Sequence, residues 1–268
     1  MSLAKHFVNK PGTTPDLGAI DPGDTSRAGT KADAKESLLR DAEAIDALQD
    51  RLFAERKRAL LVILQGMDTS GKDGTIKRVF NATGPHGVTV TSFGRPSPQE
   101  LAHDFLWRVH AACPQRGIIG VFNRSHYEDV LVGKVRSLVE PKVIEHRYEQ
   151  INAFEDLISS STRVLKIMLH ISKDEQRERL QARLNDPHKH WKFDPGDLDD
   201  RARWDEYMAA YETVLARTST EVAPWYVVPA DHKWARNAIV AGLVRATLAD
   251  MDPRYPEAAF DVGSVKIV

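Results

Sequence analysis

The fold is decided by one stretch, which reads Leu60-Leu61-Val62-Ile63-Leu64-Gln65-Gly66-Met67-Asp68-Thr69-Ser70-Gly71-Lys72-Asp73-Gly74-Thr75-Ile76. Glycines let the backbone of such a turn wrap around phosphate oxygens with successive N–H groups inward, and a helix start adds positive potential. The alternative is a plain strand-turn-helix junction with a solvated lysine, but the position between an apolar strand and a helix favours a phosphate-binding loop. Besides Lys72, the predicted binding residues of this loop are Gly66, Met67, Thr69, Ser70, Gly71, Asp73, Gly74 and Thr75.

Two positions depart from the usual form of this loop. Asp73 follows Lys72, where a Ser or Thr hydroxyl normally binds magnesium. Asp68 lies inside the loop, and a carboxylate beside phosphates is costly unless a cation bridges the two. We therefore predict that Asp68 is associated with Mg²⁺; the alternative is that it is a simple turn residue.

A second group of candidates follows the apolar run 117–122. In open α/β sheets, ligands bind at the carboxyl ends of strands. Arg124 is suited to bind a phosphoryl group in a bidentate way, and Asn123 stands where kinases of this type often have a magnesium-binding Asp. Glu128 has two readings, either a capping box with Ser125 or a residue that faces an acceptor nucleotide.

A basic segment near residues 183–203 is the third candidate. Its prolines and glycine at 187, 195 and 196 mark a loop between two helices. A mobile basic loop can close over a polyanion and expel water, so we predict a lid; a solvated surface loop is the alternative. The predicted binding residues of the lid are Arg183, Lys189, Trp191 and Lys192.

Short apolar runs alternate with longer amphipathic stretches along most of the chain. The runs cover 59–64, 88–93, 117–122, 163–171 and 225–228. Capping boxes at Ser97–Glu100 and Ser172–Glu175 mark helix starts, and the pattern predicts further helices from Asp33 onward and near 197–217. The alternation predicts one α/β domain over 33–252, with a parallel sheet in three α/β/α layers. An irregular N-terminal arm over 1–32 and a C-terminal tail over 253–268 complete the predicted organisation.

Composition excludes several classes. Lys plus Arg is 37 and Asp plus Glu is 38 in 268 residues, so a globally basic nucleic-acid binder is disfavoured. The single cysteine, Cys113, excludes an internal disulfide and a cysteine metal cluster. The apolar runs are too short for a membrane span, and the N-terminus shows no secretory signal. These observations predict a cytoplasmic protein with no nucleic-acid or membrane partner.

Taken together, three motifs resemble the polyphosphate kinase 2 family. They read Gly66-Met67-Asp68-Thr69-Ser70-Gly71-Lys72-Asp73-Gly74-Thr75, then Asn123-Arg124-Ser125-His126-Tyr127-Glu128-Asp129, then Asp186-Pro187-His188-Lys189-His190-Trp191-Lys192-Phe193. The resemblance covers residues 35–250. It implies a phosphate-loop kinase fold with a helical lid, assembled as a homo-oligomer such as a dimer or tetramer. The implied reaction is Mg²⁺-assisted, reversible transfer of the terminal phosphoryl group of inorganic polyphosphate to AMP and/or ADP.

The resemblance also assigns roles to single residues. It makes Asp68 the catalytic, magnesium-linked aspartate and Lys72 the loop lysine, with Arg124 and Arg183 as the further catalytic residues. Asn123 replaces an Asp that many members have. Glu128 replaces the Asn common in ADP-using members, so the chain is similar to the subgroup that also uses AMP. Tyr127 and Trp191 are candidates for holding the base. The sequence leaves open whether that base is adenine or guanine.

Two other functions compete with this one. The first is an ATP-dependent nucleotide or nucleoside kinase of the same fold, which would need no polyphosphate. The second is a non-catalytic nucleotide-binding regulator. Asp68 and a basic lid argue against a regulator, which needs neither.

Overall fold

The computed structural model describes residues 3–267 and contains a six-stranded sheet in the order β1-β6-β5-β2-β4-β3. All neighbouring strands pair in parallel except β1, which is antiparallel to β6. In the register, Leu64 of β2 lies opposite Asn123 of β4 and Ile167 of β5, so these strands end at one edge. The strands are β1 (Val8–Asn9), β2 (Ala59–Gln65), β3 (Val88–Ser92), β4 (Ile119–Asn123), β5 (Thr162–His170) and β6 (Trp225–Pro229).

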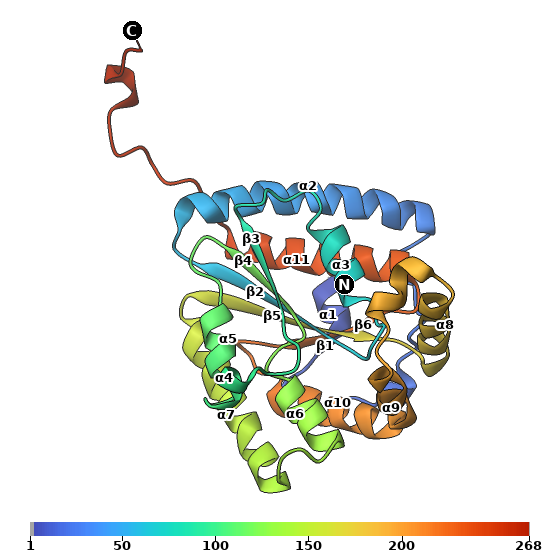
Figure 1. Cartoon of the computed structure of the whole chain (residues 1–268). Coiled ribbons are helices and arrows are strands. Elements are labelled where there is room, and N and C mark those ends of the chain that lie inside the picture. The colour runs from blue at the N-terminus through green and yellow to red at the C-terminus, as the bar shows by residue number, and fades with distance from the viewer. Residues whose placement is uncertain (1–2, 268) are drawn as a thin grey trace.

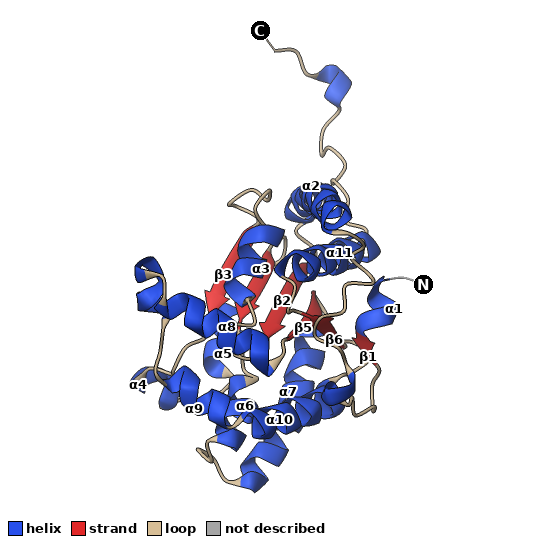
Figure 2. Ribbon diagram, turned by 90° about the vertical axis from the view of Figure 1, so that its right-hand side faces the viewer, coloured by secondary structure: helices blue, strands red, loops and turns tan. Residues whose placement is uncertain are grey.

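Helices cover both faces of the sheet, which confirms the three-layer prediction (Figures 1 and 2). Because both faces are covered, all seven residues of β2 are buried, as expected for a continuous apolar run in a parallel sheet. One layer contains α2 (Lys31–Glu55), α3 (Lys72–Val79) and α11 (Lys233–Met251); the other contains α5 (Trp107–Ala112), α6 (Glu128–Val135), α7 (Pro141–Ser159) and α10 (Trp204–Thr218).

The two capping boxes expected from the sequence have different outcomes. Ser97 and Glu100 make both reciprocal bonds at the start of α4 (Pro98–Leu101). At the start of α8 (Lys173–Leu184), the Ser172 hydroxyl accepts from the Glu175 N–H, but the Ser172 N–H donates to Asp231 instead. Glu175 is thereby free to pair with Arg179 at 2.6 Å, one turn further along α8.

The lid segment follows α8 along the carboxyl edge of the sheet. It contains η2 (Pro187–Lys192), a 3₁₀ helix, and α9 (Gly196–Ala202). The helix predicted near 197–217 is therefore two helices, α9 and α10, which meet at Arg203. The guanidinium of Arg203 donates to the carbonyl of Val135 at 2.6 Å, which fixes the break against α6.

The N-terminal arm is more regular than the sequence predicted. It contains α1 (Leu3–Phe7), the edge strand β1 and η1 (Leu17–Ala19), and residues 1–2 lie outside the described part. The arm lies on the body of its own chain, because Asn9 Nδ2 donates to Leu215 O at 3.0 Å and Val8 pairs with Tyr226. A two-residue strand carries no periodicity, so the sequence pattern could not reveal it.

The C-terminal tail extends away from the body beyond α11 (Figures 1 and 2). It contains one short 3₁₀ helix, η3 (Val262–Ser264), and residue 268 of the predicted tail lies outside the described part. Among residues 3–267, no helix is both long and apolar enough to cross a membrane.

Candidate functional site

The predicted phosphate loop lies between β2 and α3 and has an unusual backbone. Gly66, Thr69 and Gly71 all have positive φ, of 145°, 66° and 103°. A Cβ on Gly71 would lie 1.8 Å from Arg236 Nη1, and one on Gly66 would lie 2.5 Å from the Leu169 carbonyl oxygen. Both positions therefore require glycine, for conformation and for space.

Two buried arginines bind backbone carbonyl oxygens of the phosphate loop from the protein interior. Arg179 Nη1 donates to the carbonyls of Thr69 (2.8 Å) and Ser70 (3.0 Å), and Arg236 Nη1 also donates to Ser70 O (2.9 Å). Arg179 and Arg236 are 7% and 2% exposed, so these bonds are shielded from water. The loop carbonyls are thus held on this side. Neither residue was predicted as a site residue, because arginines on distant helices carry no local signal of this contact.

The other predicted loop residues divide by where their side chains point. Met67 belongs to the core, and Thr75 is buried with its hydroxyl 3.4 Å from Asn237 Oδ1, so these two can offer a ligand only their backbone. The hydroxyls of Thr69 and Ser70 are buried and make no hydrogen bond within residues 3–267. Orphaned donors in a glycine-rich loop fit a site that receives an anion.

Lys72 is the first residue of α3, and its ammonium group is nearly buried. Lys72 Nζ donates to the carbonyls of Gly66 (2.8 Å) and Met67 (3.3 Å) at the mouth of the loop. Burial, together with the charge of Arg124, lowers the pKa of Lys72 to about 8. A bound polyanion would favour the charged form of this lysine.

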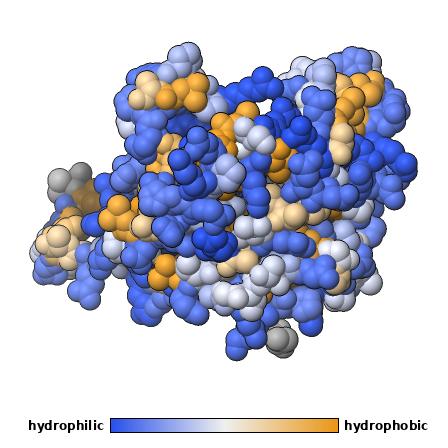
Figure 3. All heavy atoms as spheres, turned by 90° about the horizontal axis from the view of Figure 1, so that it is seen from below, coloured by the Kyte–Doolittle hydropathy of each residue, from blue (hydrophilic) through white to orange (hydrophobic). Residues whose placement is uncertain are grey.

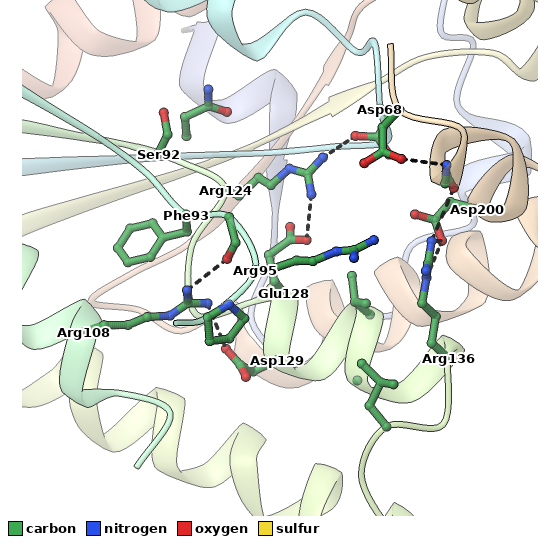
Figure 4. Close-up of a pocket in the computed structure, with 18 of the residues that line it drawn as sticks. Asp68, Ser92, Phe93, Arg95, Arg108, Arg124, Glu128, Asp129, Arg136 and Asp200 are labelled. Carbon is green, nitrogen blue, oxygen red and sulfur yellow. Dashed lines mark hydrogen bonds and ion pairs between the residues drawn. The ribbon is translucent and has the colours of Figure 1, made fainter. Parts of the chain in front are cut away.

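Asp68 and Arg124 form an ion pair between the loop and the residue after β4 (Figure 4). Arg124 has a φ of 63°, a strained conformation for a residue with a side chain, and it also approaches Glu128 at 3.5 Å. Burial works to raise the pKa of Asp68, but the charges of Arg124 and Lys72 outweigh it and hold that pKa below the usual value. Asp68 is therefore ionised at neutral pH.

Asp197, on α9, is a site residue that sequence analysis missed. Its side chain lies beside Asp68, and Arg183 Nη1 approaches it at 3.4 Å. Burial and the charge of Asp68 raise the pKa of Asp197 to about 7. The two adjacent carboxylates repel each other, and a divalent cation bound by both would relieve this repulsion.

The residue after Lys72 connects three elements. Asp73 accepts a hydrogen bond from Asn123 Nδ2 at 2.7 Å and pairs with Lys192 Nζ of the lid segment at 2.9 Å. Asp73 thereby replaces the usual hydroxyl of this loop with a link to both β4 and the lid. The structure brings Asp73, Asn123 and Lys192, three of the predicted binding residues, together at one place.

The other lid candidates lie on the surface beside this link. Arg183 Nη1 donates to the carbonyl of Lys192 at 3.2 Å, and Lys189 pairs with Asp186 at 2.6 Å. Trp191 is 78% exposed, and its indole N–H donates to His188 O at 3.0 Å. The lid segment therefore presents its cations and an aromatic ring at the edge of the site.

One prediction for the segment after β4 is wrong, and one of the two readings of Glu128 is excluded. Tyr127 does not reach a ligand cavity: it is fully buried, and its hydroxyl donates to Glu155 at 2.7 Å beneath the sheet. The Ser125–Glu128 capping box does not form, because α6 has no side-chain cap and Glu128 pairs with Arg124. Burial raises the pKa of Glu128, partly offset by the charges of Arg124 and Lys72.

Two cavities meet at Asp68 and Arg124. The lid-side cavity, about 790 Å³, lies between the phosphate loop, α8 and the lid segment. The β3-side cavity, about 910 Å³, lies between the loop after β3, α6 and α9. Seen from below, this face is hollowed between two projecting parts, with hydrophilic side chains in the hollow and hydrophobic ones beside them (Figure 3). The residues that line both cavities are Asp68, Asn123, Arg124, Asp194 and Asp197.

The cationic lining of the lid-side cavity is dense. It comes from the start of α3, the residue after β4, α8, the lid segment and the start of α11, and it comprises Lys72, Arg124, Arg179, Arg183, Lys189, Lys192 and Lys233. The β3-side cavity differs, because it also has apolar walls. Those walls include Phe93, Leu101, Val132, Leu138 and Val139.

The carboxylates fit a divalent cation that a ligand helps to hold. No group of three or more His, Cys, Asp or Glu side chains within residues 3–267 is arranged to hold a metal by itself. Asp68 and Asp197 supply two hard oxygen donors at the junction of the cavities. Mg²⁺ is commonly bound by one or two carboxylates together with phosphate oxygens, so this pair suits an ion that arrives with its substrate.

Comparisons with known proteins identify relatives that match most of the chain. Residues 28–256 match the family model described as polyphosphate kinase 2. An AMP/ADP-polyphosphate phosphotransferase of Meiothermus ruber is 49% identical, covering 94% of this chain and 95% of that protein. An ADP-polyphosphate phosphotransferase of Rhodopseudomonas palustris is 43% identical over 83% of this chain and 81% of its own. A crystal structure of polyphosphate kinase 2 from Arthrobacter aurescens superposes with a TM-score of 0.94 at 44% identity, covering 98% of this chain and 95% of that one.

Proposed function

The chain belongs to the polyphosphate kinase 2 family, and on that premise we propose that it moves the terminal phosphoryl group of inorganic polyphosphate to AMP and ADP. The observation that carries this proposal is the meeting of two unlike cavities at Asp68 and Arg124. A transferase needs two binding sites that share one reaction centre. A phosphatase or a simple nucleotide-binding protein does not.

The lid-side cavity suits the donor. Polyphosphate carries a negative charge at every phosphorus atom and no apolar surface, so it is bound by cations and loop N–H groups. Lys72, Lys192 and Lys233 approach this cavity from three different elements. The β3-side cavity suits the acceptor nucleotide, because a base and ribose need apolar walls as well as polar contacts.

Transfer requires little covalent chemistry from the protein. An oxygen of the acceptor phosphate forms a bond to the terminal phosphorus of the polymer, and the bond from that phosphorus to the bridging oxygen breaks. The shortened polymer keeps the bridging oxygen as its new terminal oxygen. Acceptor phosphates are largely ionised near neutral pH, so no general base is needed. Lys72, Arg124 and Arg183 are placed to neutralise charge on the transferred group.

Mg²⁺ is proposed as the cofactor, held by Asp68 and Asp197 together with phosphate oxygens. When bound, the ion supplies charge neutralisation between donor and acceptor. The chain's own contribution is the placement of the two carboxylates. Arg124 keeps Asp68 ionised, and Arg183 holds Asp197 from the lid side.

The acceptor range is proposed to include AMP as well as ADP. The relative from Meiothermus ruber carries both in its name, whereas that from Rhodopseudomonas palustris carries ADP alone. Glu128 lines the β3-side cavity next to Arg124, so it faces the acceptor. Whether guanine nucleotides are also used stays a prediction open to the same assay.

The decisive experiment incubates the protein with Mg²⁺ and either AMP or ADP, with and without polyphosphate, and identifies the products. Polyphosphate-dependent formation of ADP and ATP supports the proposal. Transfer from ATP to AMP or a nucleoside without polyphosphate would favour the competing kinase, and tight binding without turnover would favour a regulator. Lys72→Ala should abolish transfer while circular dichroism shows an intact fold.

Three further predictions concern the whole chain. We propose that 33–252 forms a single domain, that the protein is cytoplasmic, and that it assembles as a dimer or tetramer. The tail supports assembly, because Phe260, Val262 and Ile267 are 63%, 66% and 100% exposed on a segment that extends from the body. Light scattering on the full chain and on a variant ending at Asp252 tests this. A change in mass on truncation supports a role for the tail.

A further inference from the structure

One arginine of the β3-side cavity has no carboxylate partner within residues 3–267. The cavity is lined by five arginines, Arg95, Arg108, Arg124, Arg136 and Arg147. Four of them have carboxylate partners. Arg124 pairs with Asp68 and Glu128, and Arg136 Nη2 lies 2.7 Å from Asp200 Oδ1.

The remaining two of these four share the Asp129 carboxylate, and Arg108 also lies 3.9 Å from Glu100. Arg108 lies 3.8 Å from Asp129, and Arg147 lies 3.7 Å from it. Arg108 also donates to the Gly94 carbonyl at 3.0 Å, and the guanidinium of Arg147 lies over the Phe105 ring. Both are therefore fixed in the wall of the cavity rather than available to a ligand.

Arg95 is different. It is exposed and lines the cavity, and within residues 3–267 it makes no hydrogen bond or ion pair. It lies on the loop after β3, held next to Gly94, whose carbonyl is bound by Arg108. Figure 4 shows its side chain extending across the cavity on the side of Arg124 and Glu128.

We propose that Arg95 binds a phosphate group of the acceptor nucleotide. This inference rests on the proposed function, and it assigns the acceptor's phosphate a specific cation. The other four arginines of this cavity each pair with a carboxylate, and of these four Arg124 is assigned to the transferred group. Arg95 supplies an uncompensated guanidinium, which can bind phosphate oxygens in a bidentate way. Arg95 lines the β3-side cavity but not the lid-side cavity, which separates it from the proposed donor site.

Three variants test the proposal. Arg95→Ala removes the guanidinium and Arg95→Lys keeps only a point charge. Arg116→Ala is the matched control, because it removes the same charge from an exposed arginine beside Gly117, at the amino end of β4 and hence the opposite edge of the sheet. The readouts are KM for AMP, ADP and polyphosphate, and the affinity for AMP and adenosine by calorimetry without donor.

Arg95→Ala should raise KM for AMP and ADP by about tenfold to a hundredfold, as expected for a lost hydrogen-bonded charge pair. Arg95→Lys should recover part of this loss, and Arg116→Ala should match the parent. KM for polyphosphate and the affinity for adenosine, which has no phosphate, should change less than about twofold. Unchanged AMP affinity in Arg95→Ala, or a rise in KM for polyphosphate alone, would overturn the proposal.

Two outcomes distinguish this inference from the proposed function and from an indirect role of Arg95. If the parent shows no polyphosphate-dependent transfer but Arg95→Ala still weakens AMP binding, the proposed function fails and the binding role of Arg95 stands. If Arg95 instead serves to hold Asp194 of the lid segment, Asp194→Asn should weaken AMP binding as much as Arg95→Ala does. That result would contradict a direct contact with phosphate.

Discussion

Lys192 Nζ lies 2.9 Å from Asp73 Oδ2, which joins the lid segment to the first turn of α3. The other oxygen of this carboxylate, Asp73 Oδ1, accepts a hydrogen bond from Asn123 Nδ2 at 2.7 Å. Asp73 therefore orients a lid cation and a residue of β4 at once. Lys192 is 34% and Asp73 62% exposed at the side chain, so the pair contributes little to stability, and its value lies in where it holds the lid.

Replacing Lys192 by Ala tests that link. We expect the melting temperature to stay within about 2 °C of the parent, because exposed pairs are worth about 1 kcal/mol or less. KM for polyphosphate should rise about tenfold, because a donor cation and the lid contact are both lost. Lys142→Ala is the control, since Lys142 also pairs with a carboxylate, Glu140, but stands at the start of α7. Equal effects of the two variants on KM would rule out a role for the link.

Asn123→Asp probes the other side of Asp73. The change places a carboxylate where an amide donates at 2.7 Å, so two negative charges face each other and the pKa of one must rise. Turnover should fall by about tenfold or more at pH 8 and recover at lower pH, where one carboxyl is protonated. Asp73→Asn in the same chain should restore activity at pH 8. Failure of the double variant to recover, with an intact fold, would show that Asn123 acts independently of Asp73.

Local patterns were sufficient to predict much of the site. The loop after β2 and the residues after β4 follow apolar strands directly, and parallel strands bring their carboxyl ends to one edge, so Asp68, Lys72 and Arg124 converge as expected. Tyr127 shows the limit of this reasoning. It is close to Arg124 in sequence, but the turn into α6 directs its ring into the core against Trp225.

The residues that were missed come from distant parts of the chain. Arg179, Arg236 and Asp197 contact the loop only because sheet order and helix packing place α8, α11 and α9 around it. No short motif records that order. The orphaned arginine of the β3-side cavity could be found only by pairing every charge in three dimensions.

Asp197 predicts a pH-dependent stability. Its pKa is raised to about 7 in the folded protein from an ordinary value of 3.8, because of burial and the charge of Asp68. A carboxyl with a raised folded pKa favours folding while it is protonated, so this contribution is present at low pH and is lost as pH rises from about 4 to 7. In metal-free buffer, the stability of the parent relative to Asp197→Asn should therefore decline over this window. Urea unfolding at pH 5 and pH 8 measures it; a parallel pH dependence of parent and variant would contradict it.

Gly71 tests the support of the loop by Arg236. Gly71→Ala puts an alanine at a φ of 103° and places its Cβ 1.8 Å from Arg236 Nη1. Either the Arg236 guanidinium must give up its hydrogen bond to Ser70 O, or the loop must move. Gly12→Ala is the matched control, because its φ of 74° is also positive but nothing lies within 4 Å of the added carbon. Both changes carry about 1–2 kcal/mol of backbone strain. Only Gly71→Ala should reduce kcat/KM for polyphosphate, by about a hundredfold or more, because loop geometry is lost. Similar kcat/KM in the two variants would mean that Arg236 does not position the loop.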